Sequence, residues 1–373
     1  MDIAIIGAGV IGLATAWRVA ARGAAVTLID PAPGGGASSV AAGMLTPVSE
    51  LAYGEEPLLR LGLASRDRYR EFAAELEEAT GLATGYRADG ILEVAFDADD
   101  LRHLEEVRRF QESLGIPAEA LTGRECRKLE PMLAPGVRGG LLAPEDGAVD
   151  PRRLAPALLA AAERHGARTV RRRAAEVIVE GGAAAGVRLA DGGEVRADRV
   201  LLAAGPWSGE IGGLPPGVVP PVRPVKGQVI RLRSRVPFLR RCTRGVVRGF
   251  PIYLVPREDG EVVVGATQEE MGFDTRVTAG GLWELLRDAR ELVPGITELE
   301  FAEVSAGLRP GSPDNAPVMG PSALPGLVIG TGHFRNGILL TPVSADILAE
   351  ALLEGTVPEV GRDFTPERLV GAP

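Results

Sequence analysis

The first 30 residues constrain the fold of this chain more than any other stretch. They read as a buried strand, "DIAII", a glycine turn, "GAGVIG", a helix, "LATAWRVAARG", and a second buried strand, "AVTLID". Two such strands joined through a helix form a βαβ unit, which requires a parallel sheet covered by helices. The sequence therefore predicts an α/β fold that begins with a Rossmann-like domain.

The glycine turn has the spacing of a dinucleotide fingerprint, with Gly7, Gly9 and Gly12 in the G-x-G-x-x-G pattern. These glycines permit a tight turn, close approach of a pyrophosphate and close packing of helix on strand. Asp30 ends the second strand, where its carboxylate can accept hydrogen bonds from ribose hydroxyls and would repel a 2′-phosphate. The motif in this context predicts a dinucleotide other than NADP.

The segment after the βαβ unit, "ASSVAAGML", is too rich in small residues for an ordinary strand. Ser38 and Ser39 offer hydroxyl groups, whereas Ala41, Ala42 and Gly43 carry almost no side chain. Such a strip allows backbone amides to touch a large flat ring. The alternative is a flexible loop with no binding role.

The remaining pattern predicts two discontinuous domains. Helical periodicity covers 55–80 and 98–115, and Asp150 with Pro151 marks the N-terminus of a further helix. Short strand-like runs with tight turns between 216 and 302 predict an antiparallel sheet. We expect a doubly wound dinucleotide domain formed by residues 1–85, 146–215 and 303–373. We expect an α+β substrate domain, built on the antiparallel sheet, formed by residues 86–145 and 216–302.

Composition excludes several classes of function. The net charge of −9 argues against a nucleic-acid partner. No apolar run reaches the roughly 20 residues that cross a bilayer, and no basic leader precedes the first strand, so we expect a cytoplasmic protein that does not bind membranes. Cys126 and Cys242 lack metal or redox spacing, and the three histidines are far apart, so no metal site is predicted.

Several motifs together resemble one family. "GAGVIGLATAW", "ASSVAAGML", "VLLAAGPWSG", "GLRPGSPDNAPVMG" and "GTGHFRNGILLTP" occur in the order seen in the FAD-dependent D-amino-acid oxidase superfamily, in its glycine-oxidising branch. The similarity extends over nearly the whole chain. The family has an FAD domain and a substrate domain with an antiparallel sheet, in agreement with the layout predicted above.

The resemblance implies FAD as the cofactor and assigns a set of residues to it. These are Gly7, Gly9, Val10, Ile11, Gly12, Asp30, Pro31, Ala37, Ser38, Ala42, Gly43, Met44, Glu176, His333, Phe334, Arg335, Asn336, Gly337, Ile338 and Leu339. Relatives that link flavin covalently carry a cysteine seven residues before the Asp of the "PD" motif. Gly307 stands there, before Asp314, so FAD is expected to be non-covalent.

The resemblance also implies a substrate site. Arg309 would bind the substrate carboxylate through two parallel hydrogen bonds, and the Tyr253 hydroxyl would reach the same group. Arg335 would lie at the substrate end and add positive potential for an anionic substrate and a reduced flavin. A helix starting near Gly337 would point its N-terminus at the flavin, and His333 would pack against the cofactor instead of acting as a base.

The implied reaction is oxidative deamination of glycine and other small amines or D-amino acids, with O2 as the acceptor. The products are a 2-oxo acid, ammonia and hydrogen peroxide, and the pathway is thiamine thiazole synthesis. The α-hydride passes to the flavin, and no side chain is assigned with certainty as a catalyst. Gln268 stands where the family can carry a methionine, which leaves the preference between glycine, sarcosine and other small amines open.

Two other functions remain open on the sequence. One is a D-amino-acid dehydrogenase or a sarcosine oxidase-like flavoenzyme with another substrate or acceptor. The other is a non-catalytic FAD-binding subunit. We also expect a homo-oligomer.

Overall fold

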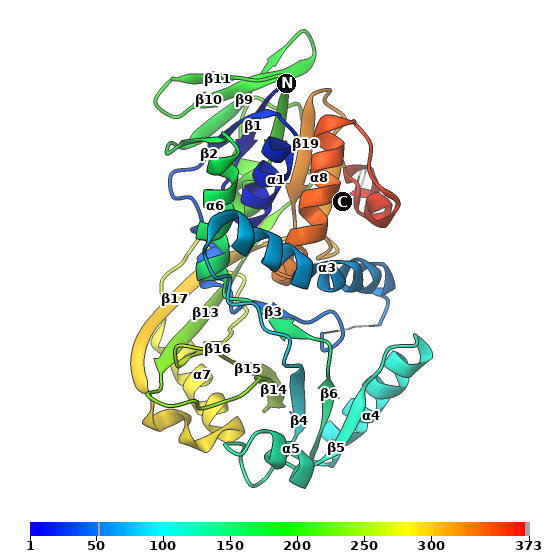
Figure 1. The fold of residues 1–373 in the computed structure, drawn as a ribbon, viewed down its shortest axis with the longest axis vertical. Helices are drawn as coiled ribbons and strands as arrows, with labels where there is room; N and C mark the ends of the chain where they lie inside the picture. Colours follow the sequence, from blue (N-terminus) through cyan, green and yellow to red (C-terminus); the bar gives the residue numbers. More distant parts are fainter. Residues whose placement is uncertain (51–52, 370–373) are drawn as a thin grey trace.

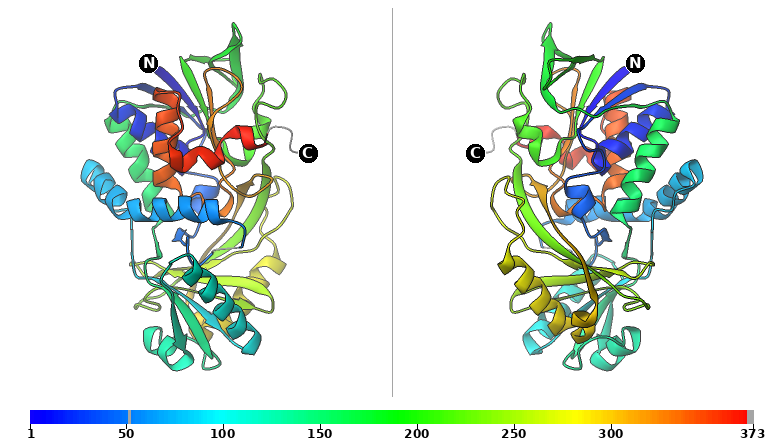
Figure 2. Two further views of the ribbon diagram at one scale, coloured as in Figure 1. Left: turned by 90° about the vertical axis from the view of Figure 1, so that its right-hand side faces the viewer. Right: turned by 90° about the vertical axis from the view of Figure 1, so that its left-hand side faces the viewer.

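A computed structural model describes residues 1–50 and 53–369. The chain forms two lobes, one above the other in Figure 1 and from the side in Figure 2. One lobe is built on a six-stranded sheet and the other on an eight-stranded sheet, and we call them the six-strand lobe and the eight-strand lobe. This arrangement is the predicted α/β fold with a second domain on a mainly antiparallel sheet.

The six-strand lobe contains the predicted βαβ unit at its centre. Its strands are, in spatial order, β18 (Val318–Pro321), β19 (Leu327–Thr331), β12 (Arg199–Leu202), β1 (Asp2–Ile6), β2 (Ala25–Ile29) and β8 (Arg168–Val170). All neighbours are parallel except β18 and β19. Because β1 and β2 flank the turn into the first helix, the sheet places the glycine motif at the carboxyl edge of its central strands.

Helices cover one face of this sheet. The helices of the lobe are α1 (Val10–Ala21), α2 (Ala37–Val40), α3 (Glu56–Thr80), α6 (Pro151–Arg164) and α8 (Thr341–Leu353). α1 packs against α6 and α8, and α3 lies across α6 and α8 (Figure 1). Their apolar faces form one large core with β1 and β2, which includes Leu13, Leu28 and Ile347.

The other face of the sheet carries strands instead of helices. β9 (Ala174–Glu180), β10 (Ala183–Leu189) and β11 (Glu194–Arg196) form a three-stranded antiparallel sheet. Val177 and Val187 of that sheet share a core with Ala4 and Val200. The prediction of a doubly wound domain was therefore wrong in this respect: alternating apolar residues in 174–189 bury one face of a hairpin, which fills the layer where a helix was expected.

The eight-strand lobe is a mixed sheet with one parallel pair. Its strands are, in spatial order, β17 (Glu300–Gly311), β13 (Arg223–Arg233), β16 (Glu261–Gly265), β15 (Phe250–Pro256), β14 (Cys242–Val247), β4 (Ile91–Ala95), β6 (Gly139–Ala143) and β5 (Glu119–Thr122). Only β14 and β4 run parallel, and every other neighbouring pair is antiparallel. The lobe also contains α4 (Ala98–Ser113), α5 (Gly123–Leu129) and α7 (Ala279–Leu292).

Helix ends follow the local signals in the sequence. α6 begins at Pro151, and the Asp150 side chain accepts a hydrogen bond from the Arg152 amide at 3.0 Å. α4 begins after Asp97, which forms a capping box with Asp100. The predicted helix start near Gly337 was wrong: a short 3-10 turn comes first, and α8 starts only at Thr341.

The domain boundaries stay a prediction, and one of them, at 302/303, falls inside a strand of the eight-strand lobe. β17 runs to Gly311 within the eight-stranded sheet, where it pairs with β13 along its whole length. A boundary at 302/303 would cut this strand, so the chain leaves the sheet only after Gly311. β3 (Met44–Leu45) and β7 (Gly147–Ala148) pair where two crossings pass each other.

Short 3-10 helices complete the described chain. They are η1 (Gly205–Glu210), η2 (Pro294–Glu298), η3 (Phe334–Asn336), η4 (Glu359–Phe364) and η5 (Pro366–Leu369). No helix within 1–50 and 53–369 is both long and apolar enough to cross a membrane. Over the same ranges, no three His, Cys, Asp or Glu side chains gather as a metal site would need.

Candidate active site between the lobes

A cavity of about 1190 Å³ lies between the two lobes and receives residues from both. The predicted residues that line it are Gly7, Gly9, Val10, Ile11, Asp30, Pro31, Ala37, Ser38, Ala42, Gly43, Met44, Tyr253, Arg309, His333, Phe334, Arg335, Gly337 and Ile338. The volume exceeds the roughly 300–1,000 Å³ of ordinary small-molecule sites. The cavity therefore has room for a dinucleotide together with a small substrate.

The glycine turn needs its glycines for steric reasons. Gly7 has φ +100°, and a Cβ there would lie 2.3 Å from the carbonyl oxygen of Ala203. A Cβ at Gly12 would lie 2.0 Å from the carbonyl oxygen of Gly7, so this glycine acts in packing and does not line the cavity. Together the two glycines let the N-terminus of α1 open directly onto the cavity.

Asp30 holds the loops on both sides of this turn. Its carboxylate accepts hydrogen bonds from the amide of Ala8 at 2.8 Å and from the amide of Ala32 at 2.7 Å. The side chain remains partly exposed at the cavity wall. Its contact with a ribose stays a prediction, but the carboxylate already fixes the turn that a dinucleotide would meet.

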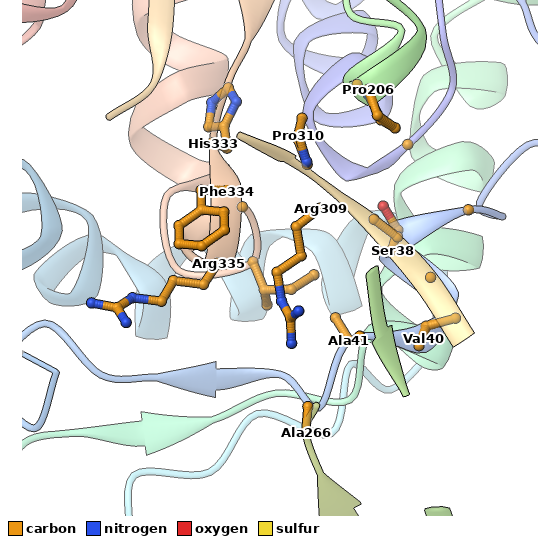
Figure 3. A pocket seen from close by; sticks show the side chains of 18 of the residues that line it. Ser38, Val40, Ala41, Pro206, Ala266, Arg309, Pro310, His333, Phe334 and Arg335 are labelled. Atoms are coloured by element: carbon orange, nitrogen blue, oxygen red, sulfur yellow. The ribbon is translucent and has the colours of Figure 1, made fainter. Parts of the chain in front are cut away.

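The small-residue strip continues the cavity wall from this turn. Ser38 lies in α2, and its hydroxyl oxygen accepts a hydrogen bond from the Val10 amide at 3.1 Å. Val40, Ala41, Ala42 and the residues that follow to Met44 then line the cavity. Figure 3 shows Val40 and Ala41 on the same side of the pocket as the Arg309 guanidinium.

These features fit FAD. One end of the cavity has the glycine turn, where a single added Cβ would clash, together with the N-terminus of α1 and the carboxylate of Asp30. A wall of small residues leads from there to the other end, where charged and aromatic side chains gather. A dinucleotide with a flat ring matches this order of features along the cavity.

Arg309 reaches the substrate end by crossing the neighbouring strand. It lies on β17, and its guanidinium lies over Gly227 of β13, where a Cβ would be 2.5 Å from Nη1. Nη1 also donates to the carbonyl oxygen of Thr267 at 3.2 Å. The rest of the guanidinium fork faces the cavity, where it can bind a carboxylate with two parallel hydrogen bonds.

Tyr253 crosses its neighbouring strand in the same way from the opposite direction. It lies on β15, and its ring covers Gly265 of β16, where a Cβ would be 2.5 Å from the hydroxyl oxygen. Since β13 and β16 are adjacent, Arg309 and Tyr253 lean toward each other over the two strands between them. Burial raises the pKa of Tyr253 to about 12, although the nearby Arg309 charge opposes this shift. The hydroxyl therefore stays a hydrogen-bond donor at neutral pH.

Arg335 lines the cavity but is directed away from Arg309 (Figure 3). Its side chain is 41% exposed, and its Nε lies 3.5 Å from a carboxylate oxygen of Glu50. The other oxygen of Glu50 lies 3.2 Å from Nη1 of Arg244, which is largely buried. This carboxylate between two arginines was missed in the sequence, because Glu50 and Arg244 belong to no motif.

His333 is buried at 3% exposure, and its Nε2 lies 3.0 Å from the hydroxyl oxygen of Ser344. Burial lowers the pKa of His333 to about 3, so the imidazole is neutral at physiological pH. Next to it, Phe334 adopts φ +47°, which turns the chain sharply between β19 and α8. The arrangement agrees with a packing role for His333, because a buried ring with so low a pKa is a weak proton acceptor, and a general base works best with a pKa near the operating pH.

Three predicted cofactor residues besides Gly12 do not line this cavity. Glu176 directs its side chain to Arg188, with 2.7 Å between the carboxylate and Nε, and the preceding Ala174 and Ala175 line the wall. Asn336 and Leu339 face a smaller hollow behind the 3-10 turn instead. The displaced start of α8 explains this, because the turn rotates these two side chains away from the cavity.

The two cysteines lie away from the position where a flavin link would form. Gly307 lines the cavity, and a Cβ there would lie 3.0 Å from Cβ of Val40. Cys126 and Cys242 are buried, and burial raises the pKa of Cys242 to about 12. Neither thiol belongs to the cavity lining.

The sequence did not identify several other residues of the cavity. Gly227 and Gly265 are essential to the reach of Arg309 and Tyr253. Arg309 lies on a strand far from Gly227 in the chain, whereas Tyr253 lies on the strand just before that of Gly265. Trp207 lines the cavity from η1 and stacks on Phe273, with ring centroids 6.1 Å apart. The sequence indicates Gly227 and Gly265 only through their position inside the strand-like stretches "VKGQ" and "VVGAT". A glycine inside a strand often marks a place where another group packs closely against the backbone.

Comparisons with known proteins agree with this geometry. Residues 2–351 match the family described as FAD dependent oxidoreductase. The chain is 38% identical over 355 residues to the bifunctional protein ThiO/ThiG of Nostoc sp., a match covering 95% of this chain and 53% of that protein. It is 35% identical to a glycine oxidase of Geobacillus kaustophilus, over 94% of this chain and 92% of that protein.

The crystal structure of glycine oxidase from Geobacillus kaustophilus superimposes with a TM-score of 0.92 at 33% identity, covering 99% of both chains. The chain thus has the same fold along its whole length. It spans about half the length of the ThiO/ThiG proteins that it matches.

Proposed function

Because the chain belongs to the FAD-dependent oxidoreductase family, we propose that it is an FAD-dependent oxidase of glycine and other small amines or D-amino acids. The products would be a 2-oxo acid, ammonia and hydrogen peroxide. One observation carries the proposal: Arg309 and Tyr253 converge over Gly227 and Gly265 at one end of a cavity whose other end fits FAD.

Arg309 would bind and orient the substrate carboxylate. A guanidinium remains charged at any working pH and matches the two oxygens of a carboxylate. Tyr253 would donate a further hydrogen bond to the same carboxylate, since its raised pKa keeps the hydroxyl protonated. Two donors that converge from opposite directions fix the carboxylate, and with it the position of the α-carbon.

The substrate amine would have to bind in its neutral form. His333 cannot hold a proton at neutral pH because its pKa is lowered to about 3. The Glu50 carboxylate is already engaged by Arg244 and Arg335. Neither His333 nor Glu50 is thus suited to take the proton of an ammonium group, which would be lost to solvent before binding, while Arg309 and Tyr253 would bind and orient the substrate.

Bound FAD would supply the oxidising chemistry, accepting two electrons from the α-carbon and amine and passing them to O2. The chain's contribution would be to hold the flavin ring along the strip of Ala41, Ala42 and Gly43, to hold the substrate against that ring, and to exclude water from the contact. Gln268 lines the same end of the cavity. Its amide offers both a donor and an acceptor, which would favour small polar amines over apolar D-amino acids.

A role in thiamine thiazole synthesis is supported by the relatives named ThiO/ThiG. In those proteins the matching region is about half of a longer chain. Supply of an imino or 2-oxo product to a thiazole-forming partner would be consistent with that arrangement.

Peroxide formation by purified yellow protein tests the proposal. Glycine, sarcosine, D-alanine and D-proline are compared with O2 alone and with an added quinone or dye acceptor. Peroxide from glycine or sarcosine without the added acceptor supports an oxidase. Turnover only with the acceptor would indicate a dehydrogenase, and no turnover with any substrate would indicate a non-catalytic FAD-binding subunit.

We also propose that the protein acts in the cytoplasm as a homo-oligomer. Fractionation of cells that express the full chain checks the first statement. Light scattering of the purified holoprotein checks the second, and a monomer mass would contradict it.

A further inference from the structure

Arginines from three separate segments of the chain hold the backbone of the small-residue strip, and two of them lie in α6 and β13. The carbonyl oxygen of Ser39 accepts hydrogen bonds from Arg152 Nε at 3.0 Å and from Arg231 Nη2 at 3.3 Å. The carbonyl oxygen of Ala42 accepts from Arg257 Nη2. Arg257 also donates through Nη1 to the carbonyl oxygen of Val149, at 3.0 Å. Its guanidinium fork therefore connects two crossings of the chain behind the cavity wall.

Arg257 differs from the other two arginines in its charge balance. Arg152 makes two contacts with Glu303, at 2.6 and 2.8 Å, and Arg231 lies 2.6 Å from Glu261. Arg257 is 8% exposed and forms an ion pair with no carboxylate in the part of the chain that the structure describes. Burial lowers the pKa of Arg257, but a guanidinium remains protonated at neutral pH. The charges of Asp150 and Glu261 favour the protonated guanidinium from a distance. Burying a cation without a directly paired carboxylate is still destabilising, so the position of Arg257 calls for a reason.

The Ala42–Gly43 peptide connects the hydrogen bond from Arg257 to the cavity. In a trans peptide the C=O and the N–H point in opposite directions. Because the Ala42 oxygen faces Arg257, the Gly43 N–H faces away from Arg257, and Gly43 lines the cavity. Among residues 1–50 and 53–369 we find no acceptor for this N–H. The donor is thus free for a ligand.

The position of this donor along the cavity identifies its target. The glycine turn and Asp30 mark the nucleotide end, and Arg309 marks the substrate end. Val40 packs on Gly307, two residues before Arg309 on the same strand. The strip therefore lies beside the substrate end, where the redox ring of FAD must meet the substrate.

We propose that Arg257 is a positioning residue for the flavin, which aims the Gly43 N–H at the ring of bound FAD and adds a buried positive charge behind it. This inference rests on FAD binding within the proposed function and does not depend on the amine substrate. The ring gains negative charge when it is reduced by two electrons, so a fixed donor and a nearby cation bind the reduced form more tightly than the oxidised form.

Two variants and a matched control test this role. Arg257→Gln removes the charge and retains a donor for one carbonyl, whereas Arg257→Lys retains the charge and loses the fork. Arg152→Gln is the control, because Arg152 holds the same strip but its side chain is 35% exposed, so solvent screens the change in charge. For each protein the dissociation constant of oxidised FAD and the midpoint potential are measured without any amino acid present.

Arg257→Gln should weaken binding of reduced FAD about 10- to 100-fold more than binding of oxidised FAD. That ratio corresponds to a midpoint potential lower by about 30–60 mV, at about 30 mV per factor of ten for a two-electron couple. Arg257→Lys should weaken binding of oxidised FAD several-fold with less than a threefold change in the ratio. Arg152→Gln should weaken binding of both redox forms equally.

The proposal is overturned if Arg257→Gln weakens binding of reduced FAD, relative to oxidised FAD, no more than Arg152→Gln does. If Arg257→Gln does not accumulate as folded protein, Arg257→Lys is the deciding variant. A tenfold larger loss of affinity for reduced FAD than for oxidised FAD in Arg257→Lys would contradict a role for the charge, and equal losses would support it. Oxidation of glycine does not enter these measurements. Failure of this inference is therefore distinguishable from failure of the proposed function.

Discussion

The two ends of the cavity are built by different means. At the nucleotide end, backbone groups form the site, and side chains such as Asp30 and Ser38 act on the backbone of neighbouring loops. At the proposed substrate end, long side chains line the cavity, and Arg309 and Tyr253 reach across strands to do so. The first kind of site depends on the absence of side chains, and the second on their precise reach.

This difference determines how each end should respond to substitution. A backbone site fails when any atom is added, because a peptide cannot move without its sheet. A side-chain site loses affinity in steps, because each group contributes its own hydrogen bonds. The variants below, ordered by expected effect, separate these two behaviours.

Gly7→Ala should have the largest effect. The new Cβ would lie 2.3 Å from the Ala203 carbonyl oxygen, at a residue with φ +100°. Strain of this kind costs on the order of 1–3 kcal/mol and shifts the turn that receives FAD. We expect protein that is nearly free of flavin, with an affinity for FAD lower by a factor of about 100, measured by titrating apoprotein. Gly136→Ala is the control, since a Cβ there meets no atom within 4 Å. Equal flavin content in both variants would contradict the backbone account.

Arg309→Ala should leave FAD in place and remove carboxylate binding. Loss of one partner of a buried charge pair costs about 2–5 kcal/mol, which corresponds to roughly a 30- to 5,000-fold rise in KM for glycine. Steady-state kinetics on flavin-loaded protein measures this rise. Arg309→Lys should recover part of the binding, because the charge remains without the fork. An unchanged KM would exclude Arg309 from the site.

Gly227→Ala tests whether reach matters as well as charge. The new Cβ would lie 2.5–2.7 Å from three atoms of the Arg309 guanidinium, which can move aside without unfolding the sheet. We expect KM for glycine to rise about tenfold with unchanged flavin content, because a group displaced by about 1 Å binds far less well. The double variant with Arg309→Ala should be no worse than Arg309→Ala alone. Additive effects would show that Gly227 acts through something other than Arg309.

The same contrast explains what could be predicted from sequence. β1, α1 and β2 follow one another in the chain, so their spacing alone located the turn and Asp30. Arg309 and Tyr253 were identified only through a resemblance, because their convergence depends on the order β17, β13, β16 and β15, which no local pattern encodes.

Errors in the prediction have the same origin. The layer formed by β9, β10 and β11 depends on packing against β12 and β1, which hydrophobic periodicity cannot distinguish from other partners. The start of α8 was misplaced because Gly337 and Leu340 already have helical dihedral angles, although regular helix begins at Thr341. Arg257 was overlooked because its partners are backbone carbonyls 108 and 215 residues away.

Tyr253→Phe should have a smaller effect than loss of Arg309. A hydrogen bond to a charged group contributes about 1.5–3 kcal/mol, so affinity for a carboxylate should fall at least roughly tenfold. Because burial raises the pKa of Tyr253 to about 12, wild-type protein should bind acetate with constant affinity from pH 7 to about 11. An unperturbed tyrosine would lose its proton near pH 10 and repel the anion. Inhibition by acetate across this range measures the effect, and a loss of inhibition centred near pH 10 would contradict the buried assignment.

Arg335→Ala should have the smallest effect, although the resemblance placed Arg335 at the substrate end together with Arg309. Its side chain is 41% exposed, Glu50 lies 3.5 Å from its Nε, and its guanidinium is directed away from Arg309. An exposed pair of this kind contributes about 0–1 kcal/mol, so KM for glycine should rise by no more than about fivefold. The midpoint potential of bound FAD should change less than in Arg257→Gln, because solvent screens an exposed charge more than a buried one. Both quantities are measured on the same preparations as for Arg309→Ala and Arg257→Gln. A rise in KM as large as that of Arg309→Ala would show that Arg335 turns into the cavity when substrate binds, and that the substrate end is held by three side chains instead of two.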